Sequence, residues 1–124
     1  MATVCLAHDL RYERQVAIKV LRELPLTLFP GVNYRFRLIN ISVYHPGAQF
    51  MLVGVRRRVQ WLPLAKDGAD LPPWQTAPTE AWRPINIGET YDFRVEVADT
   101  GAMALEVRNP AGKLMVRQPI HFVK

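Results

Sequence analysis

Strict alternation of apolar and charged residues is the feature of this sequence that most limits its fold. In residues 34–38, aromatic or aliphatic side chains occupy every second position and arginines occupy the positions between them. Alternate residues of a strand share one face, so this pattern predicts a strand with one buried and one solvated face. Residues 91–97 and 105–108 alternate in the same way. We therefore predict an all-β protein.

Turn signals separate these alternating segments at short intervals. They are Pro30-Gly31, Pro46-Gly47, Asp67-Gly68, Pro72-Pro73, Gly88, Thr100-Gly101 and Asn109-Pro110-Ala111-Gly112. Short strands with frequent turns indicate a β-sandwich or barrel. The ten prolines favour the same architecture, because proline breaks helices and is accepted at strand ends and edges. A length of 124 residues predicts one domain, 1–124.

Composition and the N-terminal residues bear on location and chemistry. With 49% hydrophobic and 22% charged residues, the chain is typical of globular proteins. It has no apolar run long enough for a transmembrane helix and no secretory leader pattern, so we expect a cytoplasmic protein without membrane contact. The single cysteine, Cys5, excludes a disulfide within the chain and a cysteine-rich zinc site.

A basic run gives one alternative function. The formal net charge is +5, and Arg56, Arg57 and Arg58 stand close to Trp61. Such a patch with an aromatic platform is used to bind single-stranded nucleic acid. The competing interpretation is a charged hairpin turn that discourages edge-to-edge pairing of strands. On this interpretation, which we favour, nucleic acid is not an expected partner.

The first 24 residues differ from the rest. Residues 3–7 and 15–21 read as two strands of a β-hairpin joined by a polar stretch. The segment Met1–Leu10 and the motif Val16-Ala17-Ile18-Lys19 resemble two small-lobe strands of bacterial serine/threonine protein kinases, the second of which carries the ATP-pairing lysine. The catalytic-loop and metal-binding motifs of a kinase do not follow, so we expect no kinase activity.

Residues 26–124 resemble a different family. The segments that carry this likeness are Tyr34–Ser42, Trp61–Pro73, Gly88–Phe93 and Leu105–Asn109. They are similar to the cupredoxin-like domains of bacterial multicopper oxidases, above all to the copper-free connecting domain. The resemblance implies an antiparallel Greek-key β-sandwich. The chain thus reads as a chimera, with the kinase-like hairpin in place of the first strands of the sandwich.

The oxidase chemistry of that family is not expected here. A type 1 copper site needs a cysteine thiolate and two histidines. The only cysteine lies in the kinase-like hairpin, and no His-Cys-His cluster occurs near the C-terminus. A borrowed hairpin that covers the core incompletely leaves open strand edges, which favour a homodimer, with exchanged strands as one form. We therefore predict a non-catalytic dimeric module without a cofactor.

The alternative function is a small metal-dependent hydrolase. The three histidines, His8, His45 and His121, are the available imidazole ligands. Three imidazoles with an open fourth position can hold a zinc ion that activates water, and Asp9 is the candidate base or orienting group. The basic residues would attract a small anionic ester, such as a phosphoester. The competing interpretation is three isolated histidines at loops or strand ends.

Two further groups of residues are assigned to structure. The tryptophans are expected to pack in the core or in a subunit interface; they are Trp61, Trp74 and Trp82. Two carboxylate pairs lie in turn-rich segments, and we expect them to be solvated; they are Asp67 with Asp70 and Glu89 with Asp92.

Overall fold

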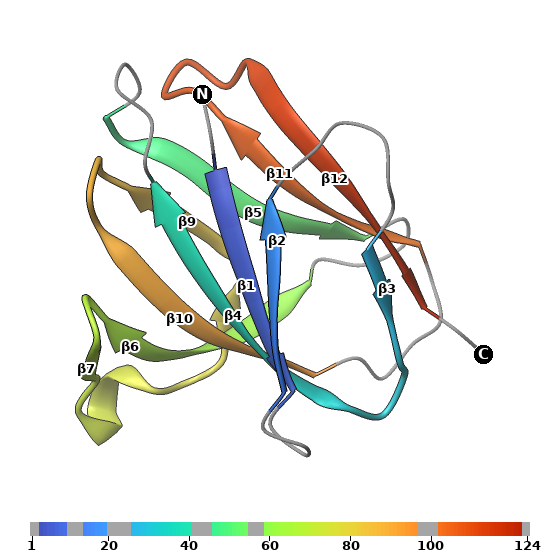
Figure 1. Ribbon diagram of the computed structural model, residues 1–124. Helices are drawn as coiled ribbons and strands as arrows, with labels where there is room; N and C mark the ends of the chain where they lie inside the picture. Colours follow the sequence, from blue (N-terminus) through green and yellow to red (C-terminus); the bar gives the residue numbers. More distant parts are fainter. Residues whose placement is uncertain are drawn as a thin grey trace.

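Two β-sheets packed face to face make up the fold (Figure 1). The computed structural model describes residues 3–9, 14–19, 26–40, 46–54, 59–96 and 102–122. Within these residues the only helical element is one short turn of 3-10 helix, η1 (Pro73–Gln75). The prediction of an all-β sandwich is therefore confirmed.

The larger sheet contains seven strands and is called the large sheet below. In spatial order it consists of β2 (Arg14–Lys19), β1 (Thr3–Asp9), β4 (Asn33–Asn40), β10 (Thr90–Glu96), β6 (Gln60–Lys66) and β7 (Ala69–Asp70), with β8 (Thr79–Glu80) also paired to β6. Every strand pair in this sheet is antiparallel.

The second sheet has five strands and is called the small sheet. Its order is β3 (Leu26–Leu28), β12 (Leu114–Phe122), β11 (Met103–Arg108), β5 (Ala48–Gly54) and β9 (Trp82–Ile85). Strand β3 runs parallel to β12, and the other pairs are antiparallel. The specific Greek-key, cupredoxin-like connectivity stays a prediction.

The N-terminal hairpin forms as expected and extends the large sheet. Strand β1 pairs with β2 on one side and with β4 on the other, from Thr3 opposite Asn40 to Asp9 opposite Tyr34. This pairing joins the first strands of the chain and β4 into one sheet. The expected turn between the hairpin strands lies outside the described residues.

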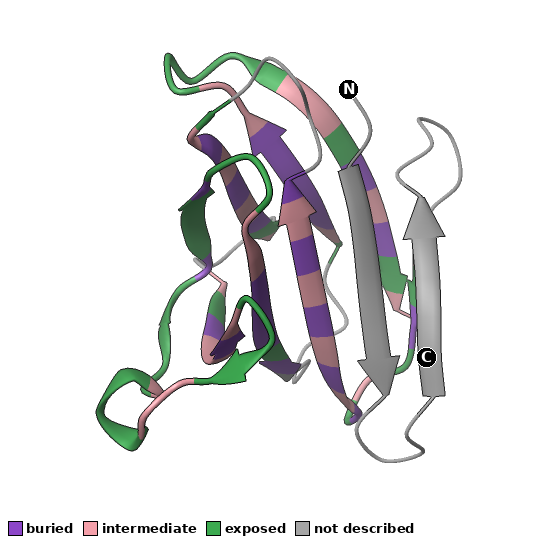
Figure 2. Cartoon of the chain, turned by 60° about the vertical axis from the view of Figure 1, so that its left-hand side comes forward, coloured by how far each residue is buried: buried purple, intermediate pink, exposed green. Residues whose placement is uncertain are grey.

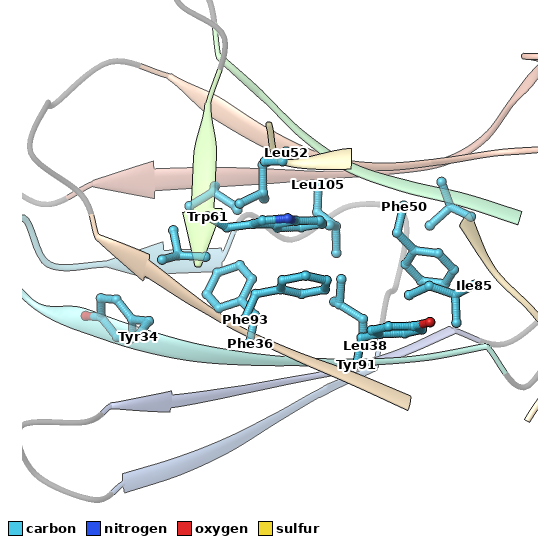
Figure 3. Packing of buried hydrophobic residues seen from close by; sticks show 14 of the residues in the cluster. Tyr34, Phe36, Leu38, Phe50, Leu52, Trp61, Ile85, Tyr91, Phe93 and Leu105 are labelled. Atoms are coloured by element: carbon cyan, nitrogen blue, oxygen red, sulfur yellow. The ribbon is translucent and has the colours of Figure 1, made fainter. Parts of the chain in front are cut away.

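Alternation along β4 places one face of the large sheet in the core. Tyr34, Phe36 and Leu38 are buried, whereas the residues between them are only partly buried (Figure 2). The same pattern in β10 buries Phe93, which stacks on Trp61 of β6 (Figure 3). Apolar side chains of the small sheet complete the core; they are Leu28, Phe50, Leu52, Ile85, Leu105, Val107 and Ile120.

The Asp67–Gly68 turn shows how a local signal shapes the fold. Both residues have positive φ, 50° and 81°. Two consecutive positive φ values define the tight hairpin turn that Asp-Gly favours. The turn connects β6 to β7, and the Asp67 side chain accepts a hydrogen bond from the Thr90 N–H at 2.9 Å. It therefore also holds the start of β10.

Candidate functional site

A buried carboxylate lies on the outer face of the large sheet. Asp92 of β10 is 2% exposed, although the alternation of β10 directs it away from the core. Arg35 Nε donates to Asp92 Oδ2 at 2.8 Å. Arg37 Nε and Nη2 donate to Oδ1 and Oδ2 at 2.9 and 3.0 Å. The prediction that Asp92 is solvated is wrong, because two arginines of β4 cover it.

Three arginines lie around Asp92 on this face. Arg35 and Arg37 follow each other on the outer face of β4, and Arg94 is exposed two residues after Asp92 on β10. The hydrogen bond with Asp92 raises the pKa of Arg37. Arg94 lies directly opposite Arg35 in the sheet. We call Arg35, Arg37, Asp92 and Arg94 the arginine cluster; it holds three guanidinium groups and one carboxylate.

The small sheet carries a similar arrangement on its outer face. Glu106 of β11 is 7% exposed. Arg108 donates to its Oε1 from Nε and Nη2 at 3.1 and 2.9 Å. Arg117 of β12 lies opposite Glu106 and approaches its Oε2 at 3.4 Å. This cluster has two guanidinium groups for one carboxylate, and both arginines bind it.

A third charged group lies around Tyr91. Lys66 Nζ forms an ion pair with Glu89 Oε2 at 3.0 Å, and Glu89 Oε1 accepts a hydrogen bond from the Asn86 backbone N–H at 2.8 Å. The Asn86 bond and the Lys66 ammonium lower the pKa of Glu89, and Glu89 in turn raises the pKa of Lys66. Arg83 lies over the Tyr91 ring, 4.7 Å from its centroid. These contacts tie the β9–β10 turn to β6.

The predicted metal ligands lie on different sheets where they are described. His8 and Asp9 are in β1, at positions opposite Arg35 and Tyr34 of β4. His121 is exposed on β12 of the small sheet, opposite Thr27. His45 lies outside the described residues. Among the residues that are described, no group of three His, Cys, Asp or Glu side chains is arranged to hold a metal ion.

Strand register also separates His121 from the chain that follows His45. Gln49 pairs with Arg108, which pairs with Leu114 at the start of β12. His121 stands seven residues farther along β12, a distance of about 23 Å in an extended strand. Pro46 to Gln49 therefore lie at one end of β12 and His121 at the other. The zinc-dependent hydrolase stays a prediction.

The tryptophans divide into two kinds. Trp61 is 2% exposed and stacks on Phe93, so packing is confirmed and no base can stack on its ring. Trp74 in η1 and Trp82 in β9 are 79% and 47% exposed. A core position is therefore wrong for both, and a subunit interface stays a prediction. Arg56, Arg57 and Arg58 lie outside the described residues.

Comparison with known proteins gives no relative. No protein-family model matches the chain, and neither the curated proteins nor the solved structures contain a significant match. In the described part of the chain no helix is long and apolar enough to span a membrane. The cytoplasmic location stays a prediction.

Proposed function

We propose that this protein is a non-catalytic β-sandwich module that forms a homodimer through the edge strand β2. An open edge presents unpaired backbone N–H and C=O groups that can pair with another strand. Strand β2 has six residues, against three in the edge strand β3 and four in β9. It contains neither proline nor glycine, whereas β9 contains Pro84. Among the described residues β2 pairs with β1 alone, and this long edge is the observation that carries the proposal.

The symmetry of a dimer suits the residues of β2. In an antiparallel pair, hydrogen-bonded and non-hydrogen-bonded positions alternate, so a two-fold axis perpendicular to the sheet sets one residue opposite its own copy. Two residues separated by an odd number of positions are then never opposite each other across the two chains, because one is at a hydrogen-bonded position and the other is not. Arg14 and Lys19 are such a pair and avoid direct charge repulsion. Val16 and Ile18 can lie opposite each other.

The non-catalytic part of the proposal is supported by the state of the buried acids. Asp92 and Glu106 both have their oxygens occupied by guanidinium groups. Both carboxylates thus serve as ion-pair partners of arginines within the fold. We further propose that the module is a chimera of kinase-like and cupredoxin-like sequence. The place of the hairpin beside β4 supports that proposal.

Proline substitutions at adjacent positions test the dimer. Successive residues of a strand direct their N–H groups to opposite edges. Of Val16→Pro and Ala17→Pro, one therefore removes an N–H on the open edge and the other removes an N–H that faces β1. We expect a dimer mass for the unsubstituted protein in analytical ultracentrifugation. We expect a folded monomer for one variant and reduced thermal stability for the other.

The control is Trp74→Ala, which removes the most exposed large apolar side chain among the described residues and leaves β2 unchanged. It should leave the dimer intact. Loss of the dimer in this variant, or a monomeric unsubstituted protein at high micromolar concentration, would overturn the proposal. A dimer that survives both proline substitutions would do the same.

A further inference from the structure

Arg35 and Arg94 stand directly opposite each other on neighbouring strands of the large sheet. Side chains in this position lie about 5 Å apart at Cβ, and like charges there destabilise a sheet. A bound anion removes this repulsion. We propose that the arginine cluster is a phosphate-binding site and that the phosphate group lies between Arg35 and Arg94. This role is independent of whether two chains pair through β2.

Asp92 leaves part of the cluster free to bind. Arg37 uses Nε and Nη2 on the carboxylate, but Arg35 uses only Nε. Neither Nη atom of Arg35 bonds to a described residue, and Arg94 has no partner among the residues described. Nη groups form the fork that binds two oxygens of a phosphate. N–H donors that suit an oxyanion therefore remain on both strands, from Arg35 on β4 and from Arg94 on β10.

The same carboxylate holds the binding groups in place. Asp92 is buried, and its hydrogen bonds restrict the side chains of Arg35 and Arg37. A side chain that is already restrained loses less conformational entropy when a ligand binds. Asp92 is thus a positioning residue, while Arg35 and Arg94 would contact the phosphate.

Charge selects the class of anion. Three guanidinium groups against one carboxylate leave two positive charges on the cluster. Phosphate monoesters carry about 1.5 to 2 negative charges near neutral pH, and inorganic phosphate carries more than one. The cluster around Glu106 lacks this property for two reasons. It has one arginine fewer, and Arg108 and Arg117 both already bind the carboxylate.

NMR titration with inorganic phosphate at constant ionic strength tests the proposal. Saturable shifts are expected in β4 and β10 and in the Nε–H signals of Arg35 and Arg37. Arg94→Gln should weaken binding ~5-fold or more, and Arg94→Lys, which keeps the charge without the fork, should weaken it less. The matched control is Arg117→Gln, which removes one positive charge from the opposite sheet and should change the affinity less than ~2-fold.

Thermal unfolding and a second ligand test the same site. Phosphate should raise the melting temperature of the unsubstituted protein more than that of the Arg94→Gln variant. Phenyl phosphate in place of phosphate separates two sources of the ligand, since tighter binding of phenyl phosphate indicates a monoester and tighter binding of phosphate indicates the free ion. Equal weakening by Arg94→Gln and Arg117→Gln would overturn the site, because net charge alone would then explain binding. Absence of saturable shifts would overturn it as well.

Discussion

Trp61 lies flat against Phe93, with ring centroids 3.8 Å apart and an interplanar angle of 13°. The two rings come from adjacent strands of the large sheet, and Phe93 also lies 6.0 Å from Tyr91. This aromatic row faces the small sheet and forms the centre of the core (Figure 3). Trp61, which next to the basic run suggested nucleic-acid binding, therefore has a structural role.

Replacement of Trp61 should therefore cost much of the stability of the protein. We expect Trp61→Ala to lower the free energy of unfolding by about 3–5 kcal/mol, because it leaves a large cavity beside Phe93. Urea unfolding followed by circular dichroism measures this change. Trp74→Ala is the control, because Trp74 is 79% exposed and its loss should change stability by less than about 0.5 kcal/mol. Similar losses in both variants would contradict the assignment.

Asp92 should be the carboxylate most important for stability. In Asp92→Asn, an amide N–H₂ faces the guanidinium donors, and Arg35 and Arg37 lose their charged partner. We expect a loss of about 2–3 kcal/mol, because hydrogen bonds to a buried charge are strong. The control Asp70→Asn alters an exposed carboxylate in β7 and should change little. Equal stability of the two variants in thermal unfolding would show that the Asp92 contacts contribute nothing.

The ion pair of Glu89 with Lys66 predicts a defined pH dependence. The folded-state pKa of Glu89 is lowered, so its contribution is complete above its unfolded pKa of about 4.3 and disappears as the pH falls through the folded value. The folded-state pKa of Lys66 is raised, so its contribution is lost only as alkaline pH passes that value.

Glu89→Gln isolates the acidic limb of this dependence. It should lower the unfolding free energy near pH 7 by about 0.5–1 kcal/mol. The difference from the unsubstituted protein should disappear toward pH 3, where Glu89 itself becomes protonated. Urea unfolding between pH 3 and pH 7 provides the measurement. A difference that stays constant down to pH 3 would mean that the charge of Glu89 does not stabilise the fold.

The metal content of the purified protein distinguishes the two candidate functions, a non-catalytic module and a zinc-dependent hydrolase. His121 lies at one end of β12, and the residues that follow His45 lie at the other. We therefore expect elemental analysis of protein equilibrated with zinc and then dialysed to give far less than one ion per chain. Near-stoichiometric zinc that disappears when His8, His45 and His121 are all replaced by alanine would instead establish the hydrolase site.

Local patterns predicted the faces of strands but not which strands meet. Alternation in residues 34–38 assigns Tyr34, Phe36 and Leu38 to the core because the period of a strand is two. Asp67–Gly68 specifies its own turn. Burial of Asp92 depends on arginines 55 and 57 residues earlier in the chain. Nothing close to Asp92 in sequence reveals that β4 lies beside β10, so alternation alone placed this side chain in water.

The tryptophans show the same limit. Residue type gave Trp61, Trp74 and Trp82 the same expectation, yet only Trp61 is buried. The difference is positional. Trp61 faces the core from β6, whereas Trp74 belongs to the η1 segment. Trp82 lies on the edge strand β9, and its indole N–H donates a hydrogen bond to Gln49 at 2.8 Å. Without the strand order, these three environments look alike.

The parallel pairing of β3 with β12 has a consequence for synthesis on the ribosome. Residues 26–28 bind residues 120–122, at the far end of the described chain. At bacterial and eukaryotic elongation rates, β3 emerges several seconds before its partner strand. The hairpin β1–β2 can form at once, because its contacts are local. This edge of the small sheet cannot form before residues 120–122 have been synthesised, so the nascent protein exposes apolar residues of β3 until translation has passed β12.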